Sequence, residues 1–363
     1  MRTPPRSVLI IVTRRIGDVL LATPLMRSVK RAWPHAALDV LVFEGTQAVI
    51  AANANPDVRR VLTVPERPGA SEHLAFMGRL FRRYDIALST LHGDRPTLYA
   101  WLAGRWRAGL LNPTDKERWK RPLLHHWIPF DNWNTHTVLM NLALAGPLGI
   151  EPRREVAVSW QREDAAAVDA QLGSGSTPIA VLHPYPKFNY KMWHRDGWCE
   201  VAAWLAARGY RVALTGGGDP AEVDYVAALA RGMPPQTDDF AGRLSLGQTA
   251  YLLSRASAFV GPDTATTHMA AALGVPTVAL YGPTDPVKWG PWPRDYEGAT
   301  NPWGRLGTQI VGKVCLVQGD AACAPCHKEG CDRHVGSYSD CLQQLSAATV
   351  ISALERLLNK RAQ

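Results

Sequence analysis

Residues 258–282 read AFVGPDTATTHMAAALGVPTVALYG, and this stretch contains one complete unit of an α/β fold. The apolar run 258–260 predicts the end of a strand, residues 269–273 predict a helix of small side chains, and residues 277–281 predict the next buried strand. An acid and three hydroxyl side chains stand where the helix starts, and a helix start presents free N–H groups that bind phosphate. A single such side chain is enough to cap a helix. Four of them therefore favour a ligand site over a capping role, and they are followed by a histidine: Asp263, Thr264, Thr266, Thr267 and His268.

The same alternation of apolar runs and helical patterns extends in both directions. It begins with an expected strand at 7–13 and a helix reaching residue 33, and it restarts at residue 179 after the Gly/Ser-rich stretch 173–178. Two successive series predict two Rossmann-like doubly wound domains that face a central cleft, with ligands at the carboxyl ends of the strands. The expected divisions are 1–172, a linker at 173–178, 179–345, and a last helix in 346–363 that could pack back on the first domain.

Composition limits the classes of protein. The 363 residues include 46% apolar residues, enough for two cores, and no apolar run reaches the length of about 20 residues that spans a bilayer. The early run 8–12 is too short for a secretion signal, so we expect a cytoplasmic protein. Residues 1–172 contain 23 Lys and Arg against 16 Asp and Glu, whereas the rest contains 17 against 16. A basic first half indicates an anionic partner or a membrane surface, although solubility alone could also explain it.

The first strand is followed by Arg14, Arg15, Gly17 and Asp18. The glycine allows a tight turn, and the acid falls at the start of the next helix. A carboxylate there could act as a general base toward an acceptor hydroxyl, or it could simply favour the helix start.

Three groups in the second half could contact a nucleotide. Lys191 could sit on a diphosphate and neutralise its charge, with Lys187 as the competing candidate. Three glycines at 216–218 precede Glu222, an acid that could accept hydrogen bonds from ribose hydroxyls. The pattern does not match the dinucleotide fingerprint. No Asp-x-Asp pair occurs, which weakens any interpretation as a metal-dependent sugar transferase.

Two further clusters have open interpretations. A loop in the first half interleaves cations with Trp119 and Trp127, which suits an anionic acceptor or a membrane surface, or a plain solvated loop. No nucleic-acid module accompanies it. Its cations are Lys116, Arg118, Lys120 and Arg121. Late cysteines could hold structural zinc or iron, or could be buried free thiols. They are Cys323, Cys326, Cys331 and Cys341.

Taken together, these residues resemble the ADP-heptose:lipopolysaccharide heptosyltransferases, glycosyltransferase family 9, over nearly the whole chain. The resemblance depends on residues 15–24 (RIGDVLLATP), 191–193 (KMW), 242–246 (GRLSL) and 263–272 (DTATTHMAAA), and on the Cys-x-Pro-Cys cluster. It implies a GT-B fold that binds the acceptor in the first domain and the ADP-sugar in the second. It also implies inverting, metal-independent transfer of L-glycero-D-manno-heptose to the lipopolysaccharide inner core at the inner membrane, with no cofactor.

The resemblance also implies individual roles. Asp18 matches the general base, Lys191 the diphosphate-binding lysine, and residues 263–268 the loop that holds diphosphate and sugar. Glu222 matches the ribose-binding acid, and Leu244 lies where adenine packs. Ala265 stands where family members often have glycine, so backbone approach to the diphosphate could be restricted. Two alternatives stay open: a nucleotide-sugar enzyme acting on a protein or another acceptor, and a non-catalytic protein that binds nucleotides or polyanions.

Overall fold

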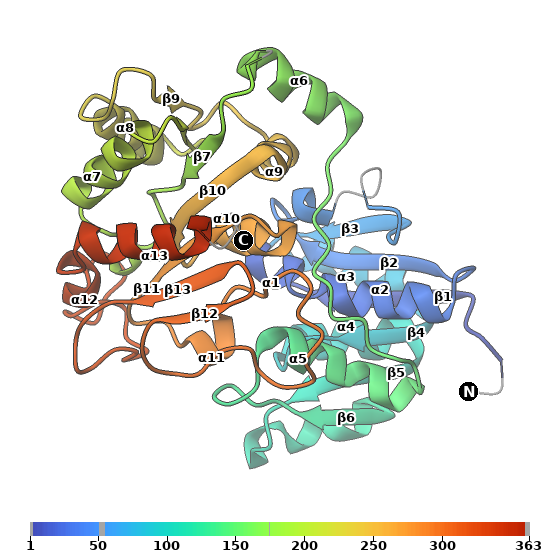
Figure 1. Cartoon of the computed structure of the whole chain (residues 1–363). Helices are drawn as coiled ribbons and strands as arrows, with labels where there is room; N and C mark the ends of the chain where they lie inside the picture. Colours follow the sequence, from blue (N-terminus) through green and yellow to red (C-terminus); the bar gives the residue numbers. More distant parts are fainter. Residues whose placement is uncertain (1–2, 51–54, 174, 360–363) are drawn as a thin grey trace. The chain divides into compact units, whose positions relative to one another are not determined.

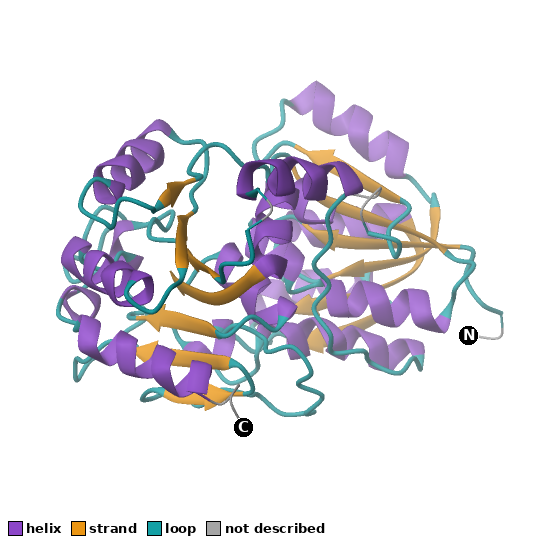
Figure 2. Cartoon of the chain, turned by 45° about the horizontal axis from the view of Figure 1, so that its top comes forward, coloured by secondary structure: helices purple, strands orange, loops and turns teal. Residues whose placement is uncertain are grey.

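The computed structural model describes residues 3–50, 55–173 and 175–359. The chain divides into two compact units, Met1–Ser159 and Trp160–Gln363, each an α/β layer structure of its own (Figure 1). Figure 2 shows that each unit has strands covered by helices. This confirms the predicted fold class of two doubly wound units.

The first unit is built on a fully parallel sheet of six strands in the order β3-β2-β1-β4-β5-β6. The strands β1, β2 and β4 are mostly apolar because both faces of the sheet are covered. Asp39 is a buried acid within β2, and its carboxylate accepts from Arg59, Arg60 and Tyr84. The strands are β1 (Ser7–Val12), β2 (Ala37–Phe43), β3 (Arg60–Val64), β4 (Tyr84–Ser89), β5 (Gly104–Leu111) and β6 (His126–Pro129). The α-helices are α1 (Ile16–Leu20), α2 (Thr23–Ala32), α3 (Ala70–Leu80), α4 (Asp94–Ala103) and α5 (Thr137–Leu142). Short 3-10 helices are η1 (Gln47–Ile50), η2 (Asp115–Leu123) and η3 (Ala143–Leu148).

The second unit has a seven-stranded sheet in the order β12-β13-β11-β10-β7-β8-β9, parallel except for β12. The strands are β7 (Ile179–Leu182), β8 (Arg211–Leu214), β9 (Asp238–Asp239), β10 (Ala256–Pro262), β11 (Thr277–Tyr281), β12 (Gln309–Val311) and β13 (Val314–Gln318). The helices are α6 (Arg162–Leu172), η4 (Asn189–Lys191), α7 (Arg195–Ala206), α8 (Pro220–Ala230), α9 (Leu246–Arg255), α10 (Ala265–Leu273), α11 (Pro286–Trp289), α12 (Asp340–Gln343) and α13 (Ala347–Asn359).

The boundary between the units differs from the sequence-based division at 172. Helix α6 belongs to the second unit because it packs against α9. Polar contacts fix this packing: Tyr251 Oη donates to the Asp169 carboxylate at 2.9 Å, and Ser245 Oγ donates to Asp164 at 3.1 Å. The Gly/Ser-rich stretch 173–178 therefore joins α6 to β7 within one unit.

The last helix, α13, also differs from the expectation that it packs on the first domain. It lies against β11, β13 and α7 of the second sheet (Figure 1). Its apolar stripe, Val350, Leu354 and Leu357, is buried in the core of that unit. The stripe matches the apolar face of its own sheet, which explains where the helix packs.

Candidate active site

The loop between β10 and α10 places a buried acid beside a helix start. Thr264 is the N-cap of α10, and its hydroxyl accepts from the Thr267 N–H at 3.5 Å. Asp263, 8% exposed, comes directly before this cap. Its neighbours at the sheet end are Tyr281 Oη, which donates to Asp263 Oδ1 at 3.3 Å, and His268 Nε2 at 3.7 Å from the same oxygen. The first N–H groups of a helix have no partner within it, so this end of α10 can receive an anion.

Lys191, from η4, forms an ion pair with Asp263. Burial by itself raises the pKa of the Asp263 carboxyl, but the charge of Lys191 and the nearby His268 ring outweigh burial and hold that pKa well below its usual value. Burial and the neighbouring carboxylate raise the pKa of Tyr281 far above its usual value. Asp263 is therefore ionised and Tyr281 neutral at physiological pH.

The segment 336–345 holds the Lys191 loop in place. Ser339 Oγ donates to the Tyr190 carbonyl at 2.8 Å, and the Trp193 indole N–H donates to the Leu345 carbonyl at 2.7 Å. Trp193 is buried, which anchors the end of the loop. The competing candidate Lys187 is exposed, and its Nζ lies 5.9 Å from the centre of the Phe188 ring. The structure thus brings Lys191, not Lys187, to the acid of the α10 loop.

His183 is a further polar residue of this site that sequence reasoning did not single out. It directly follows β7, and its Nδ1 lies 3.1 Å from Thr215 Oγ1, just after β8. Its Nε2 lies 3.4 Å from Thr266 Oγ1 on α10. Burial lowers its pKa to about 4, so the imidazole is neutral. The ring links the ends of two strands to the start of α10. The available signal was a histidine directly after a buried strand.

Glu222 lies beside the glycine turn that follows β8. The Glu222 carboxylate accepts the Gly217 N–H, and burial raises its pKa. A Cβ at Gly217 would lie 2.9 Å from Glu222 Oε2, so the glycine permits this close approach. Gly242, at φ 69°, donates its N–H to the Gly216 carbonyl at 3.2 Å and brings half-buried Leu244 to the same turn. The first acid of this segment, Asp219, is the N-cap of α8.

In the first unit, Asp18 lies in the first turn of α1, directly after β1, and is buried. Its Oδ1 is 3.6 Å from Arg14 Nη1. Arg15 is the N-cap residue and is exposed, and Gly17 is half-buried. A carboxylate at the carboxyl end of the central strand is where a doubly wound sheet presents its ligand-binding groups.

The basic loop of the first unit does not act as a single surface, which corrects the grouping of its four cations. Lys120 is 2% exposed, and its Nζ bonds the Asp94 carboxylate at 2.6 Å and the His92 carbonyl at 2.7 Å. A buried ammonium ion needs such partners, so this lysine fixes the loop from inside. Arg121 lies over the Trp127 ring at 4.5 Å. Lys116 and Arg118 remain on the exposed side.

The late cysteines lie near one another, since three of their thiols affect the pKa of Cys341. Burial raises this pKa first, and the thiols of Cys326, Cys323 and Cys331 raise it further, to about 12. Cys341 is buried, while Cys323 and Cys331 are exposed. Within residues 3–50, 55–173 and 175–359, no group of three or more His, Cys, Asp or Glu side chains has an arrangement that could hold a metal ion. A zinc or iron site at these cysteines remains a prediction from their spacing.

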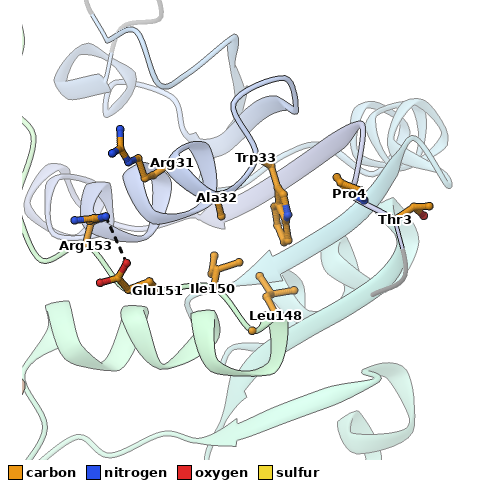
Figure 3. Close-up of a pocket in the computed structure, with 10 residues that line it drawn as sticks. Thr3, Pro4, Arg31, Ala32, Trp33, Leu148, Ile150, Glu151 and Arg153 are labelled. Atoms are coloured by element: carbon orange, nitrogen blue, oxygen red, sulfur yellow. Dashed lines mark hydrogen bonds and ion pairs between the residues drawn. The ribbon is translucent and has the colours of Figure 1, made fainter.

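A pocket of about 500 Å³ lies in the first unit (Figure 3). It is lined by the chain before β1, the end of α2 and the end of η3, which places it at the amino edge of the sheet. Trp33 and Ile150 supply apolar walls, and Arg153 pairs with Glu151 at 3.4 Å. The pocket contains none of the predicted site residues.

Two doubly wound units, each with a mostly parallel sheet and polar groups at the carboxyl ends of its strands, have the architecture of the GT-B fold. The model of glycosyltransferase family 9 (heptosyltransferase) matches residues 100–308, more than half of the chain, so the chain belongs to this family. It is similar to lipopolysaccharide heptosyltransferase 3 of Escherichia coli, with 28% identity over 76% of this chain and 83% of the relative. It is also similar to lipopolysaccharide heptosyltransferase 1 of Pseudomonas aeruginosa, with 29% identity over 89% of this chain and 87% of the relative.

Solved structures agree on the fold. The family 9 glycosyltransferase from Veillonella parvula superposes with a TM-score of 0.77 at 20% identity, covering 98% of this chain and 97% of that one. E. coli heptosyltransferase WaaC with ADP gives a TM-score of 0.72 at 23% identity, covering 97% and 99%. No helix within the described residues is long and apolar enough to cross a membrane.

Proposed function

We propose that this enzyme transfers heptose from ADP-L-glycero-D-manno-heptose to an inner-core acceptor of lipopolysaccharide, with inversion and without a metal. Membership of family 9 and the names of its relatives support the sugar and the acceptor class. The observation that carries the proposal is the Lys191–Asp263 pair at the start of α10. It supplies one cation for a diphosphate and one ionised acid for sugar hydroxyls.

The second unit binds the donor in this proposal. The ADP diphosphate lies at the N-terminus of α10, where Thr264, Ala265 and Thr266 offer N–H groups and hydroxyls. Lys191 adds positive charge. Glu222 accepts from the ribose hydroxyls, and Leu244 packs against adenine beside the same glycine turn.

Asp263 and His268 bind the heptose in this proposal. The Asp263 carboxylate accepts from the heptose hydroxyls, since it is held ionised. His268 is 5% exposed, and its Nδ1 has no hydrogen-bond partner among the described residues. A buried ring nitrogen without a partner carries a desolvation cost that a sugar hydroxyl would relieve.

The first unit binds the acceptor and supplies the base. The acceptor O–H bond breaks, and its proton passes to the Asp18 carboxylate. The freed oxygen electron pair forms the bond to the anomeric carbon, and the electrons of the old C–O bond leave with ADP. Direct displacement inverts the anomeric centre. Lys191 and the start of α10 stabilise the charge that grows on the departing diphosphate, which is the task a divalent cation performs elsewhere.

The acceptor carries phosphate and carboxylate groups in this proposal, and the exposed cations of the first unit match them. Arg14 and Arg15 flank the base, while Lys116 and Arg118 lie on the exposed side of η2. A lipid-linked acceptor places the enzyme at the cytoplasmic face of the inner membrane, as a peripheral protein.

Calorimetric titration with ADP, UDP, GDP and CMP in the presence of a chelator tests the donor. We expect a clear preference for ADP, and a preference for UDP or GDP would replace the proposed donor. The Asp18→Asn variant tests the base. We expect transfer to fall about 10²–10⁴-fold while ADP affinity stays within about twofold. Asp115→Asn, an exposed acid of the same unit, is the matched control. Loss of ADP binding in Asp18→Asn would contradict the assignment of the base.

A further inference from the structure

Helix α3 and the residue that ends it expose two large apolar side chains. Leu74 is 69% exposed, and Phe81, the residue that ends the helix, is 61% exposed. They stand seven positions apart in the sequence. This spacing is about two helical turns, so they lie on one side of the helix. Phe76, Met77 and Leu80 of the same helix pack against the core. Leu74 and Phe81 lie outside this packed set, and large apolar side chains that gather on a surface mark an interaction site.

The end of the adjacent helix α4 extends this apolar face. Trp101, in its last turn, is 39% exposed. The two helix ends are joined, because the Arg82 N–H donates to the Leu102 carbonyl at 2.8 Å. Phe81 and Trp101 are the residues directly before these two bonded groups. Their backbones therefore stand close together at the ends of α3 and α4.

Arginines are close in sequence to Phe81 and Trp101. Segments 79–83 and 101–107 contain five arginines and no acid. None of the five forms an ion pair with an acid among the described residues: Arg79, Arg82, Arg83, Arg105 and Arg107. Burial and then the charge of Arg82 lower the pKa of Arg107. Arg82 and Arg107 thus repel each other, and an anion placed near them would relieve that repulsion.

We propose that this α3–α4 patch, formed by Leu74, Phe81 and Trp101 with their arginines, docks on the surface of a bilayer that contains anionic phospholipids. The apolar side chains enter the headgroup boundary and the arginines contact phosphates, the two contributions that bind interfacial helices. A second copy of this chain is a poor occupant, because the face would bring five arginines against five. The inference rests on the proposed function, since a lipid-linked acceptor requires an enzyme at a membrane.

Vesicle sedimentation without donor or acceptor tests the patch. The wild-type protein is mixed with phosphatidylethanolamine vesicles that contain phosphatidylglycerol, and in parallel with pure phosphatidylcholine vesicles. We expect binding to the anionic vesicles, and an at least tenfold lower partition for each of two double variants. One is Leu74→Ser with Phe81→Ser, and the other is Arg83→Glu with Arg105→Glu. Each lost arginine alone is expected to lower partition about fivefold.

Two matched variants of the second unit are the controls. Leu306→Ser with Val335→Ser removes equally exposed apolar side chains, and Arg231→Glu with Arg255→Glu makes the same change in net charge. Both are expected to bind as the wild type does. An equal loss of vesicle binding in Arg231→Glu with Arg255→Glu would show that net charge, and not this patch, determines binding.

Two further outcomes would overturn the proposal. One is no preference of the wild type for anionic vesicles. The second is a wild-type dimer that Leu74→Ser with Phe81→Ser disperses in sedimentation velocity, which would make the face a self-interface. Transfer to a delipidated, water-soluble acceptor is expected to be unchanged in every variant. This readout separates a failed docking surface from a failed function and also reports on folding.

Discussion

Replacing Lys191 by methionine removes the charge that Asp263 depends on, while it keeps most of the side-chain length. Asp263 is 8% exposed, so its carboxylate would be left in a poorly solvated place. Removing one partner of a buried ion pair costs about 3–5 kcal/mol of folding free energy. Tyr281 and His268 still face the carboxylate, and the Lys191 side chain is 17% exposed. We therefore expect a loss near the lower end, about 3 kcal/mol.

The pH dependence of this loss has a definite sign. The pair holds the pKa of Asp263 below its usual value of 3.8, so its contribution is present above that value and is lost as pH falls through the folded-state pKa. In the Lys191→Met variant burial dominates and raises the same pKa. The variant then loses stability as pH rises, because the carboxylate must ionise without its cation. The difference between variant and wild type is expected to grow from pH 4 to pH 7.

Urea unfolding followed by circular dichroism measures both effects. The transition that ADP shifts to higher urea belongs to the second unit, and its midpoint is the quantity compared. The double variant Lys191→Met with Asp263→Asn is expected to lose about 2 kcal/mol less than the sum of the single variants. Lys187→Met is the control and is expected to change stability by less than about 0.5 kcal/mol. Additive single changes, or equal effects at the two lysines, would refute the pairing.

Three other changes separate binding from structure. Glu222→Gln is expected to lower the affinity for ADP about tenfold in calorimetry and to leave pyrophosphate binding unchanged, because the carboxylate contacts ribose in the proposed complex. An equal loss of affinity for both ligands would mean that Glu222 acts on the phosphates instead. His183 has a pKa of about 4 against a usual 6.5, so the folded state excludes its proton and stability falls by about 3 kcal/mol as pH drops from 6.5 to 4. His183→Asn is expected to remove this pH dependence of the unfolding free energy, measured by urea unfolding. An unchanged pH dependence would mean that another group causes it. Lys120→Met is expected to cost about 3 kcal/mol of stability in the first unit while the acceptor KM stays unchanged. A raised KM in a protein with unaltered melting temperature would return Lys120 to acceptor binding.

The local parts of the site could be predicted from the sequence. The strand and the helix of residues 258–273 depend on neighbours within a few positions. The helix was expected at 269–273, and it begins earlier, at Ala265, with Thr264 as its N-cap. The choice between Lys187 and Lys191 depends on Asp263, 72 residues beyond Lys191. Spacing along the chain contains no information about such a contact. Both lysines therefore remained candidates until the fold placed one of them at the acid.

The position of Lys120 could not be predicted from the sequence either, because its partner is also distant along the chain. Its cluster of cations and tryptophans has the composition of a binding surface, yet its Nζ is bound to Asp94, which stands 26 positions earlier at the start of α4. A run of cations in the sequence gives the charge of a segment, but it does not show which of these side chains is buried and paired with an acid. The predicted domain boundary at residue 172 differs from the observed one after Ser159 for the same reason. A flexible composition marks a loop, whereas the packing of α6 on α9 depends on Asp164 and Ser245, far apart in sequence.

The alanine at position 265 departs from the glycine common in the family, and the backbone explains why it can be accommodated. Ala265 is the first residue of α10, and it is absent from the residues with positive φ in the described part of the chain. Helical backbone is open to every L-residue, so glycine is not needed there for conformation. The methyl group of a first-turn residue also leaves its N–H directed out of the helix end. Ala265 therefore keeps the backbone donor that a diphosphate uses, and the positive charge at this site depends on Lys191 rather than on extra backbone freedom.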